Sequence, residues 1–276
     1  MRDQRGNVTE PGNEVDDGMS EAPRVSLSAR GEFVRAAVEY LQGKRSAVTQ
    51  EDDRRTTRRG GTSQPGGARP LPGALGIRMV AELVGRSHAA PLFHFPDRMT
   101  LVAAVAAQGF CQLVVTLGSP AGRKRTGAQR LRDTALRYAQ WAGETPALFA
   151  TMYDPELAPA LELLAMAPDE DDATRRIAER FGGAAPATRR RVQALRELLD
   201  AKQEALMLFV NAARDGIVDG SLRADMSPVQ IAHAVASMAD GLAWQRVTEP
   251  QGSVQLLDRH ASVTLRLLLQ GISAQA

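Results

Sequence analysis

The sequence has little cysteine, few aromatic residues and no recognisable secretory signal. Cys111 is the one cysteine among 276 residues, which excludes an intrachain disulfide framework and a metal site built from several cysteines. Aromatic residues make up 4% of the chain, so the core must consist mainly of aliphatic side chains and alanine. No uncharged apolar run is expected to reach the roughly 18 residues of a membrane-spanning helix, and the acidic start lacks the basic-then-apolar order of a signal peptide. We therefore expect a cytoplasmic protein with no membrane partner.

A net charge of +2 conceals an uneven distribution along the chain. Residues 1–25 carry three basic and six acidic side chains, residues 26–130 sixteen and seven, and residues 131–276 fifteen and nineteen. The positive excess therefore lies in one stretch. A basic segment beside a mildly acidic remainder indicates one module for a polyanion and another for a different partner, although ordinary solvated surface charge would give the same count.

Strand-like alternation of apolar and polar residues is also absent, whereas helical spacing recurs along most of the chain. The spacing predicts an all-α fold with helices at 28–42, 77–84, 88–95, a longer one through 101–114, and at 127–142, 145–152, 155–167, 173–181, 188–216, 227–247 and 254–271. Ser26 or Ser28 is expected to cap the first helix, and Ser227 with Pro228 to begin the tenth.

Composition divides the chain into three parts. Residues 1–25 are polar and lack apolar periodicity, which predicts a disordered tail. Residues 26–118 form a first domain with an insertion at 43–73, where glycine, proline and arginine replace any periodic pattern. Residues 126–273 form a second, larger helical domain.

The first domain contains the proportions of a helix-turn-helix. Two short helices, 77–84 and 88–95, flank the turn Gly85-Arg86-Ser87. In that arrangement the second helix enters the major groove of DNA with its N-terminal residues toward the base edges. Spacing alone leaves open an αα-hairpin of a helical bundle.

The residues of this stretch resemble a known family. The run GIRMVAELVGRSHAAPLFHFPDRMTLVAAVAAQGF (76–110) is similar to the DNA-binding domain of TetR-family transcriptional regulators, whose pattern is R-x-I/V-A-x-x-A/V-G-V-S-x-x-x-x-Y-x-H-F-x-x-K-x-x-L. The matching positions are Arg78, Val80, Ala81, Val84, Gly85, Ser87, His94, Phe95 and Leu101. The segment 135–153 resembles the start of that family's ligand-binding domain, and Asp240-Gly241-Leu242 resembles its WHG-type C-terminal domain more loosely.

The resemblance assigns roles to residues of the helix-turn-helix. Ser87 is expected to cap the second helix, and Val80, Ala81, Phe95, Leu101 and Val105 to form the small core that supports it. Base edges or groove walls are expected to meet His88, Ala89, Leu92 and Phe93, and phosphates to meet Arg78, Arg86, His94 and Arg98.

Four positions depart from the family pattern: Leu92 replaces its tyrosine, Arg86 its valine, Arg98 its lysine, and Gly76 the threonine before the first short helix. These changes indicate either weakened DNA binding, compensated by arginines of the insertion, or a degenerate regulator. The insertion arginines are Arg54, Arg55, Arg58, Arg59 and Arg69.

For the second domain, the resemblance implies a small-molecule inducer pocket and a homodimer interface. The helices at 227–247 and 254–271 have the apolar faces that a dimer needs, although packing within one chain would use such faces too. Large side chains are the pocket candidates, and each is also explained as ordinary core. They are Tyr138, Trp141, Phe149, Met152, Met166, Met207, Phe209, Met238 and Trp244, and Tyr153 and Phe181 are two further large side chains of this domain.

Enzymatic motifs find no support in the sequence. The four histidines form no metal-ligand spacing with carboxylates, and residues 60–67 (GGTSQPGG) lack the strand and lysine of a nucleotide-binding loop. We expect no cofactor and no metal. The sequence therefore predicts a homodimeric, ligand-responsive transcriptional regulator, with a repressor favoured, that binds palindromic operator DNA. The alternative is a helical ligand-binding or protein-interaction dimer whose DNA binding is lost or non-specific.

Overall fold

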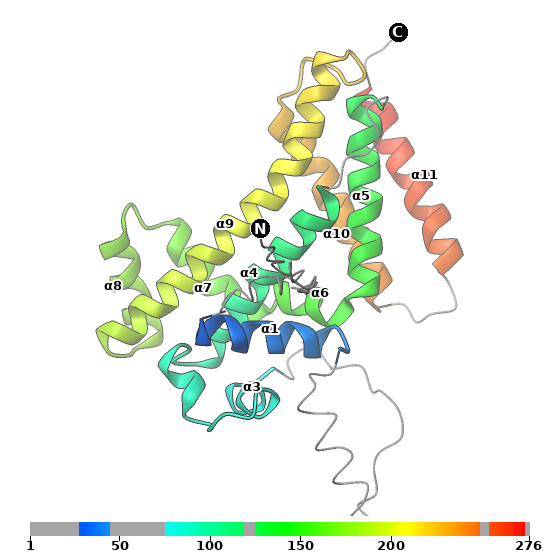
Figure 1. The fold of residues 1–276 in the computed structure, drawn as a ribbon. Coiled ribbons are helices and arrows are strands. Elements are labelled where there is room, and N and C mark those ends of the chain that lie inside the picture. Colours follow the sequence, from blue (N-terminus) through cyan, green and yellow to red (C-terminus); the bar gives the residue numbers. More distant parts are fainter. Residues whose placement is uncertain (1–27, 45–74, 119–124, 249–253, 274–276) are drawn as a thin grey trace, which may run out of the picture.

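The computed structural model describes residues 28–44, 75–118, 125–248 and 254–273, and every regular element in these ranges is a helix (Figure 1). The predicted all-α class is confirmed. The tail at 1–25 and nearly all of the insertion at 43–73, with the five arginines named above, lie outside the described residues.

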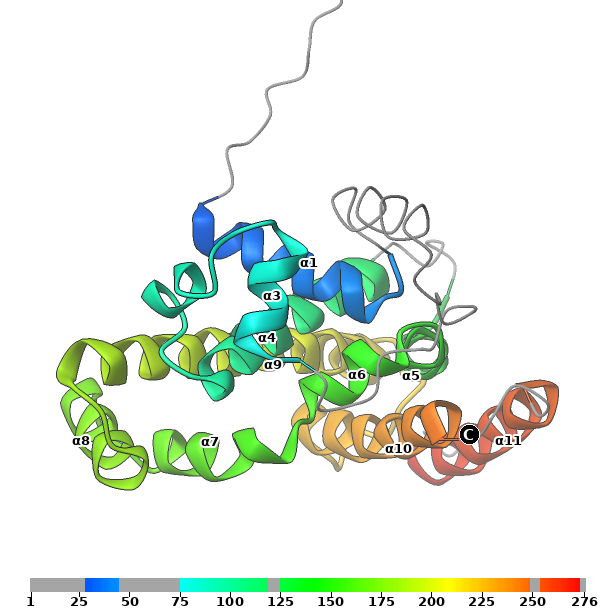
Figure 2. The same cartoon turned by 90° about the horizontal axis from the view of Figure 1, so that it is seen from below.

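The N-terminal part consists of α1 (Ala29–Leu41), α3 (Ile77–Leu83), the short 3-10 helix η1 (Ala90–Phe93) and α4 (Arg98–Leu117). Ser28 caps α1, since its hydroxyl accepts a hydrogen bond from Gly31 N at 3.2 Å. Figure 2 shows α1 and α3 together on one side of the molecule, in front of α4 and α9.

The C-terminal part contains the remaining helices. They are α5 (Gly127–Glu144), α6 (Pro146–Met152), η2 (Pro155–Leu157), α7 (Ala158–Ala165), α8 (Glu170–Phe181), α9 (Ala185–Val218), α10 (Pro228–Thr248) and α11 (Val254–Ile272). The single helix expected at 155–167 is instead a 3-10 turn, opened by Pro155 and capped by Asp154, followed by the shorter α7. Ser227 caps α10 as predicted, because its hydroxyl accepts from Gln230 N at 3.2 Å.

The long helix α9 connects the two parts. With 34 residues it extends about 51 Å and runs from α8 past α4 toward the end where α5, α10 and α11 lie (Figure 1). Both α4 and α5 pack on it, as does α10. The helix-turn-helix side and the far bundle therefore share one continuous helical support.

The core helix α4 corrects one expectation from the sequence. Residues 99–117 carry no charged side chain, so by length and composition α4 is the one described helix that could span a membrane. In this fold, however, 67% of its apolar window is buried. Its neighbours are α1, α6 and α9, which gives α4 the environment of a core helix.

Candidate nucleic-acid interface

The first helix and the turn of the predicted helix-turn-helix are present. After α3 ends, Gly85 adopts a φ of 64°, a left-handed conformation that glycine adopts at little cost. The chain is tied back to α3 by a hydrogen bond from Arg86 N to Ala81 O at 3.0 Å. The predicted supporting core is also confirmed, because Val80, Ala81, Phe95, Leu101 and Val105 are all fully buried.

The second element is shorter than the expected helix at 88–95. Only Ala90–Phe93 is helical, in 3-10 geometry, and no side chain caps it, so Ser87 does not serve as the expected cap. Two prolines explain the difference. Pro91 has no backbone N–H to donate, and Pro96 disfavours helical geometry at the residue before it. At about 2 Å per residue, η1 spans only about 8 Å.

The four candidates for base or groove contacts all lie at the surface. His88, Ala89, Leu92 and Phe93 are exposed, with Phe93 72% and Leu92 47% accessible. The imidazole of His88 lies 3.1 Å from a carboxylate oxygen of Glu82 on α3. Three of these four exposed side chains are thus apolar, and the polar one, His88, already has Glu82 as a partner.

The four phosphate candidates have different environments. Arg78 is exposed on α3, and Arg86 is exposed but lies 3.2 Å from Glu32 of α1. The half-buried ring of His94 packs against Phe33 and Phe95. Burial, together with the charges of Arg190 and Arg30, lowers its pKa, so the neutral form is favoured there. Arg98 is bonded inside the protein, to groups described further below.

The positive excess of residues 26–130 is only partly in the described structure. Eight basic and four acidic residues of this stretch are described, so five of the nine excess positive charges lie in 45–74 and 119–124. Six of the eight described cations are in ion pairs, as Arg30, Arg35, Arg86, Arg98, Arg125 and Arg130 each have an acidic partner. Surface ion pairs of this kind stabilise by about 0–1 kcal/mol, so phosphates could displace the exposed ones.

Four of the large side chains proposed for a ligand pocket form an aromatic cluster with Tyr153. Phe149 is central, with ring centroids 5.0 Å from Tyr153, 5.2 Å from Trp244 and 5.9 Å from Tyr138. Phe209 joins the cluster through Tyr138 at 6.3 Å. Met152 is buried nearby on α6, within the same core. These side chains fill space and pack on one another.

The other pocket candidates are scattered. Trp141 is buried and Met238 half-buried, whereas Met207 is 37% and Met166 70% exposed. None of the nine candidates lines either of the two cavities described next.

The larger of these cavities measures about 740 Å³ and lies between α1, α4 and α9. Its floor is apolar, from Val34, Val38, Ala104, Ala107 and Ala201, and α9 adds a wall of three carboxylates. Those carboxylates belong to Glu197, Asp200 and Glu204. The second cavity, of about 620 Å³, lies between α8 and the start of α9. No sequence pattern indicates the larger cavity, because its walls come from three segments far apart in the chain.

Metal-binding groups are not evident in the described part of the chain, where no three or more His, Cys, Asp or Glu side chains gather suitably for an ion.

Comparison with known proteins identifies the fold. No protein-family model matches the sequence, and no curated protein does either. Among solved structures, a bacterial regulatory protein in the TetR family from Rhodococcus RHA1 superposes with a TM-score of 0.52 and 13% identity, over 91% of this chain and 100% of its own. A protein of unknown function from Rhodococcus sp. RHA1 gives 0.51 and 19%, over 92% of this chain and 100% of its own. The chain thus has the fold of a TetR-type regulator.

Proposed function

We propose that this protein is a DNA-binding transcriptional regulator that acts as a homodimer in the cytoplasm. The observation that carries the proposal is the exposed helix-turn-helix on a buried core: α3, the turn at Gly85 and η1 project from the scaffold of α1 and α4. The TetR-type fold supports it, since regulators of that architecture use this module for DNA. A repressor is the favoured mode of action.

The contacts with DNA would be made by the turn and η1. His88 is the candidate for base recognition, because among His88, Ala89, Leu92 and Phe93 it alone has a polar side chain. Phe93 and Leu92 would make apolar contacts, such as those with thymine methyl groups. Arg78 and Arg86 would contact phosphates, which positions the protein without selecting a sequence.

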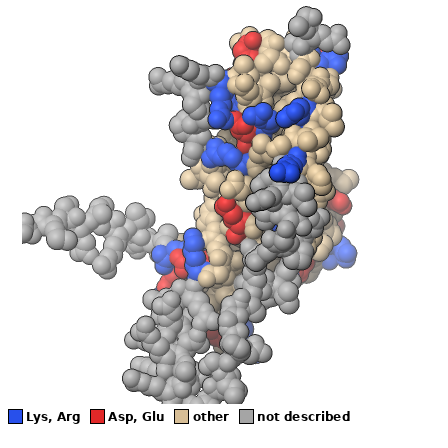
Figure 3. Space-filling model, turned by 90° about the vertical axis from the view of Figure 1, so that its right-hand side faces the viewer, with Lys and Arg blue, Asp and Glu red and all other residues tan. Residues whose placement is uncertain are grey.

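Dimerisation through α10 and α11 would present two such modules to palindromic DNA. The exposed residues of α10 recur at helical spacing along one face and carry no fixed charge; they include Ala234, Ser237, Gly241, Trp244 and Thr248. Interfaces between protein chains are depleted of charged residues at their centre. On α11, Val263 and Leu267 are more than half exposed and extend this surface. In Figure 3, which shows the side that faces right in Figure 1, the described surface is largely uncharged, with Lys and Arg gathered near the upper end.

The response to a small molecule is assigned to the cavity between α1, α4 and α9. Its volume lies in the range of ligand sites, and its apolar floor suits an apolar molecule. Its walls carry charges of both signs, since Arg30, Arg35 and Lys44 line it together with the carboxylates and Arg30 is paired with Glu197, so a polar group of the ligand would bind at these walls. A ligand there would separate α1, which supports the helix-turn-helix, from α9. Any change in DNA affinity would then follow from the altered position of that module.

Electrophoretic mobility shifts with DNA upstream of the protein's own gene test the proposal. His88→Ala should change the preference between related sequences, with a cost of about 1–3 kcal/mol on the preferred site. Arg78→Gln should weaken binding to all duplexes and reduce the slope of log affinity against log salt by about 1. Arg214→Gln is the control, because Arg214 is exposed on α9 far from α3.

A second candidate function is a protein-interaction dimer of the same fold that has lost specific DNA binding. It is favoured by the apolar tip and by the acidic partners of Arg86 and His88. Either of two results would reject the regulator and support this alternative: no DNA binding even at low salt, or binding with no preference for the upstream DNA over random duplex.

A further inference from the structure

Two adjacent residues at the start of α4 attach the helix-turn-helix to the C-terminal helices at two separate places. Asp97 and Arg98 follow η1 after only three residues, His94, Phe95 and Pro96. Each bonds to a different element of the C-terminal part. Because Phe95 is fully buried and Pro96 is conformationally restricted, this short connection allows η1 little freedom relative to α4.

Arg98 makes the first attachment. Its Nη2 donates to Asp154 Oδ2 at 2.9 Å, and its Nη1 donates to Glu156 of η2. Its Nε donates to the backbone oxygen of Leu75 at 3.0 Å, which holds the entry to α3. Burial alone would lower the pKa of Arg98, but the hydrogen bonds and charges of Asp154 and Glu156 outweigh it and raise that pKa. The guanidinium therefore joins α3, α4 and η2 in one fixed fork.

Asp97 makes the second attachment. One carboxylate oxygen caps α4, accepting from Thr100 N at 2.8 Å, and the other accepts from Arg191 of α9. Arg191 is 8% exposed and also donates to Gly182 O, where α8 ends. A buried charge that loses its partner is costly, so this pair resists separation.

The residue before Asp154 extends the first attachment to α10. Tyr153 donates through its hydroxyl to Asp240 Oδ1 on α10 at 3.0 Å, and Tyr138 of α5 donates to the same oxygen. The two tyrosine hydroxyls lie 2.6 Å apart. Burial, with the nearby Asp240, raises the pKa of Tyr153, which keeps its hydroxyl protonated and able to donate.

We propose that Asp97, Arg98 and the Tyr153–Asp154 pair are positioning residues that fix the orientation of the helix-turn-helix relative to α10. Asp97 and Arg98 hold it at two points, and Tyr153–Asp154 relates one of these points to the helix assigned above to the dimer interface. A displacement of α10 at that interface is thereby transmitted to η1. The expected effect on DNA binding rests on the proposed function. The positioning of the helix-turn-helix relative to α10 does not, because it depends only on contacts within the protein.

Distances measured by double electron–electron resonance test the inference without DNA. Spin labels are placed at exposed positions of the turn and of α10, Ala89→Cys and Gln245→Cys, in a Cys111→Ser background that removes the exposed native thiol. Labelled protein is diluted with unlabelled protein, so that distances within one chain dominate. The parent should give one narrow distance distribution. Arg98→Gln should at least double its width, and Tyr153→Phe, which keeps the ring but not the hydrogen bond, should broaden it as well.

Matched variants separate positioning from mere stability. Arg175→Gln removes an ion pair of the same chemistry within α8 and should leave the distribution unchanged. The double variant Arg98→Gln/Asp154→Asn should broaden it no more than Arg98→Gln alone, since both changes remove one shared interaction. Arg98→Lys, which keeps the charge but not the fork, should lie between the parent and Arg98→Gln.

A lowered melting temperature with an unchanged distribution in Arg98→Gln would overturn the proposal. An unchanged distribution in Tyr153→Phe would overturn the connection to α10. A protein that binds no DNA yet shows both broadenings would retain the positioning role and lose the proposed function, so the two failures are distinguishable.

Discussion

Pro91 lies within the second element of the helix-turn-helix and Pro96 follows its end, and their positions explain why it is so short. Neither proline disturbs the core, because Phe95 between them remains fully buried. The six residues 91–96 therefore keep the buried support that the resemblance implies, while the element resting on that support is shortened. Phe93 and Phe95 are the same residue type, but Phe93 faces solvent whereas Phe95 is fully buried. Their roles therefore differ because of where each lies in the fold.

His94 offers a prediction about pH. Its pKa is lowered in the folded protein, by burial first and then by Arg190 and Arg30. The folded state thus binds this proton less readily than the unfolded state. The resulting stability is present above the ordinary value of 6.5 and is lost as the pH falls below it.

The melting temperature should accordingly fall more between pH 7 and pH 5 in the parent than in His94→Gln, as measured by differential scanning calorimetry. His233→Gln, which removes an exposed imidazole from α10, is the control. Parallel curves for the parent and His94→Gln would contradict the argument.

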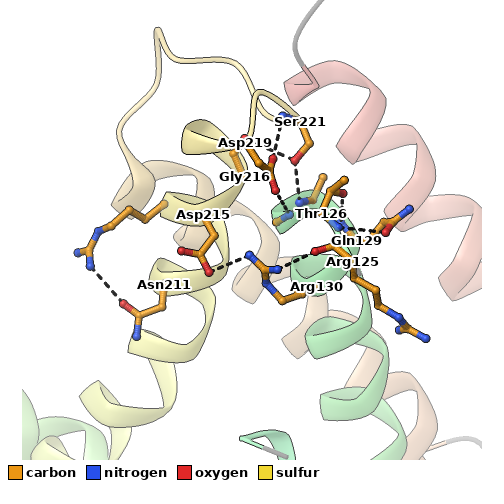
Figure 4. Close-up of polar contacts among 12 residues, drawn as sticks. Arg125, Thr126, Gln129, Arg130, Asn211, Asp215, Gly216, Asp219 and Ser221 are labelled. Atoms are coloured by element: carbon orange, nitrogen blue, oxygen red, sulfur yellow. Dashed lines mark hydrogen bonds and ion pairs between the residues drawn. The ribbon is translucent and has the colours of Figure 1, made fainter. Parts of the chain in front are cut away.

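At the scale of elements, the joint between α5 and α9 shows how close two helices come when glycine permits it. Gly127 N at the start of α5 donates to Asp219 Oδ2 at 2.6 Å, and Ala128 N donates to Ser221 Oγ at 3.1 Å (Figure 4). The turn after α9 thus satisfies the first N–H groups of α5. Arg130 strengthens the joint by pairing with Asp215 at 2.8 Å.

Gly127→Ala should disrupt this joint. A Cβ at this position would lie 2.0 Å from Gly216 N and 2.3 Å from Gly216 Cα, so the helices must separate. We expect a loss of about 1–3 kcal/mol in the free energy of unfolding, measured by denaturant titration. Gly271→Ala is the control, because nothing lies within 4 Å of its added carbon. Equal stability of both variants would reject the close approach.

At the scale of the molecule, α9 joins the helix-turn-helix end to the α10–α11 end, and one buried cluster extends through both (Figure 1). The two ends are then mechanically related, which is why the contacts of Asp97 and Arg98 matter far from α4 itself. At the α10–α11 end, the exposed face of α10 is a large surface that carries no fixed charge among the described residues.

Gly241→Glu tests whether that surface is the dimer interface. No atom lies within 4 Å of a Cβ added at Gly241, so the fold of one chain should tolerate the change. Across a two-fold axis it would bring like charges together, and dimer affinity should fall at least about tenfold in sedimentation analysis. Gln203→Glu, on the exposed face of α9, should leave it unchanged. An unaltered dimer in Gly241→Glu would place the interface elsewhere.

Local signals in the sequence determined much of this architecture. Ser28 and Ser227 mark helix starts and Gly85 marks the turn, because caps and turns act over a few residues. The supporting core was identified through the resemblance of residues 76–110 to a known family. The length of η1 was overestimated, because the spacing of residues 88–95 is that of a short helix, whereas Pro91 and Pro96 prevent an α-helix of that length.

Only the tertiary structure decided what the charged and aromatic side chains do. Arg98 meets Asp154 across 56 residues, and Asp97 meets Arg191 across 94, so no local pattern reveals that these groups are already bonded. The aromatic residues suited a cavity by composition, yet packing joined them to one another and left the larger cavity beside α1. Periodicity identifies which face of a helix is buried, whereas the partner of each side chain depends on how distant helices meet.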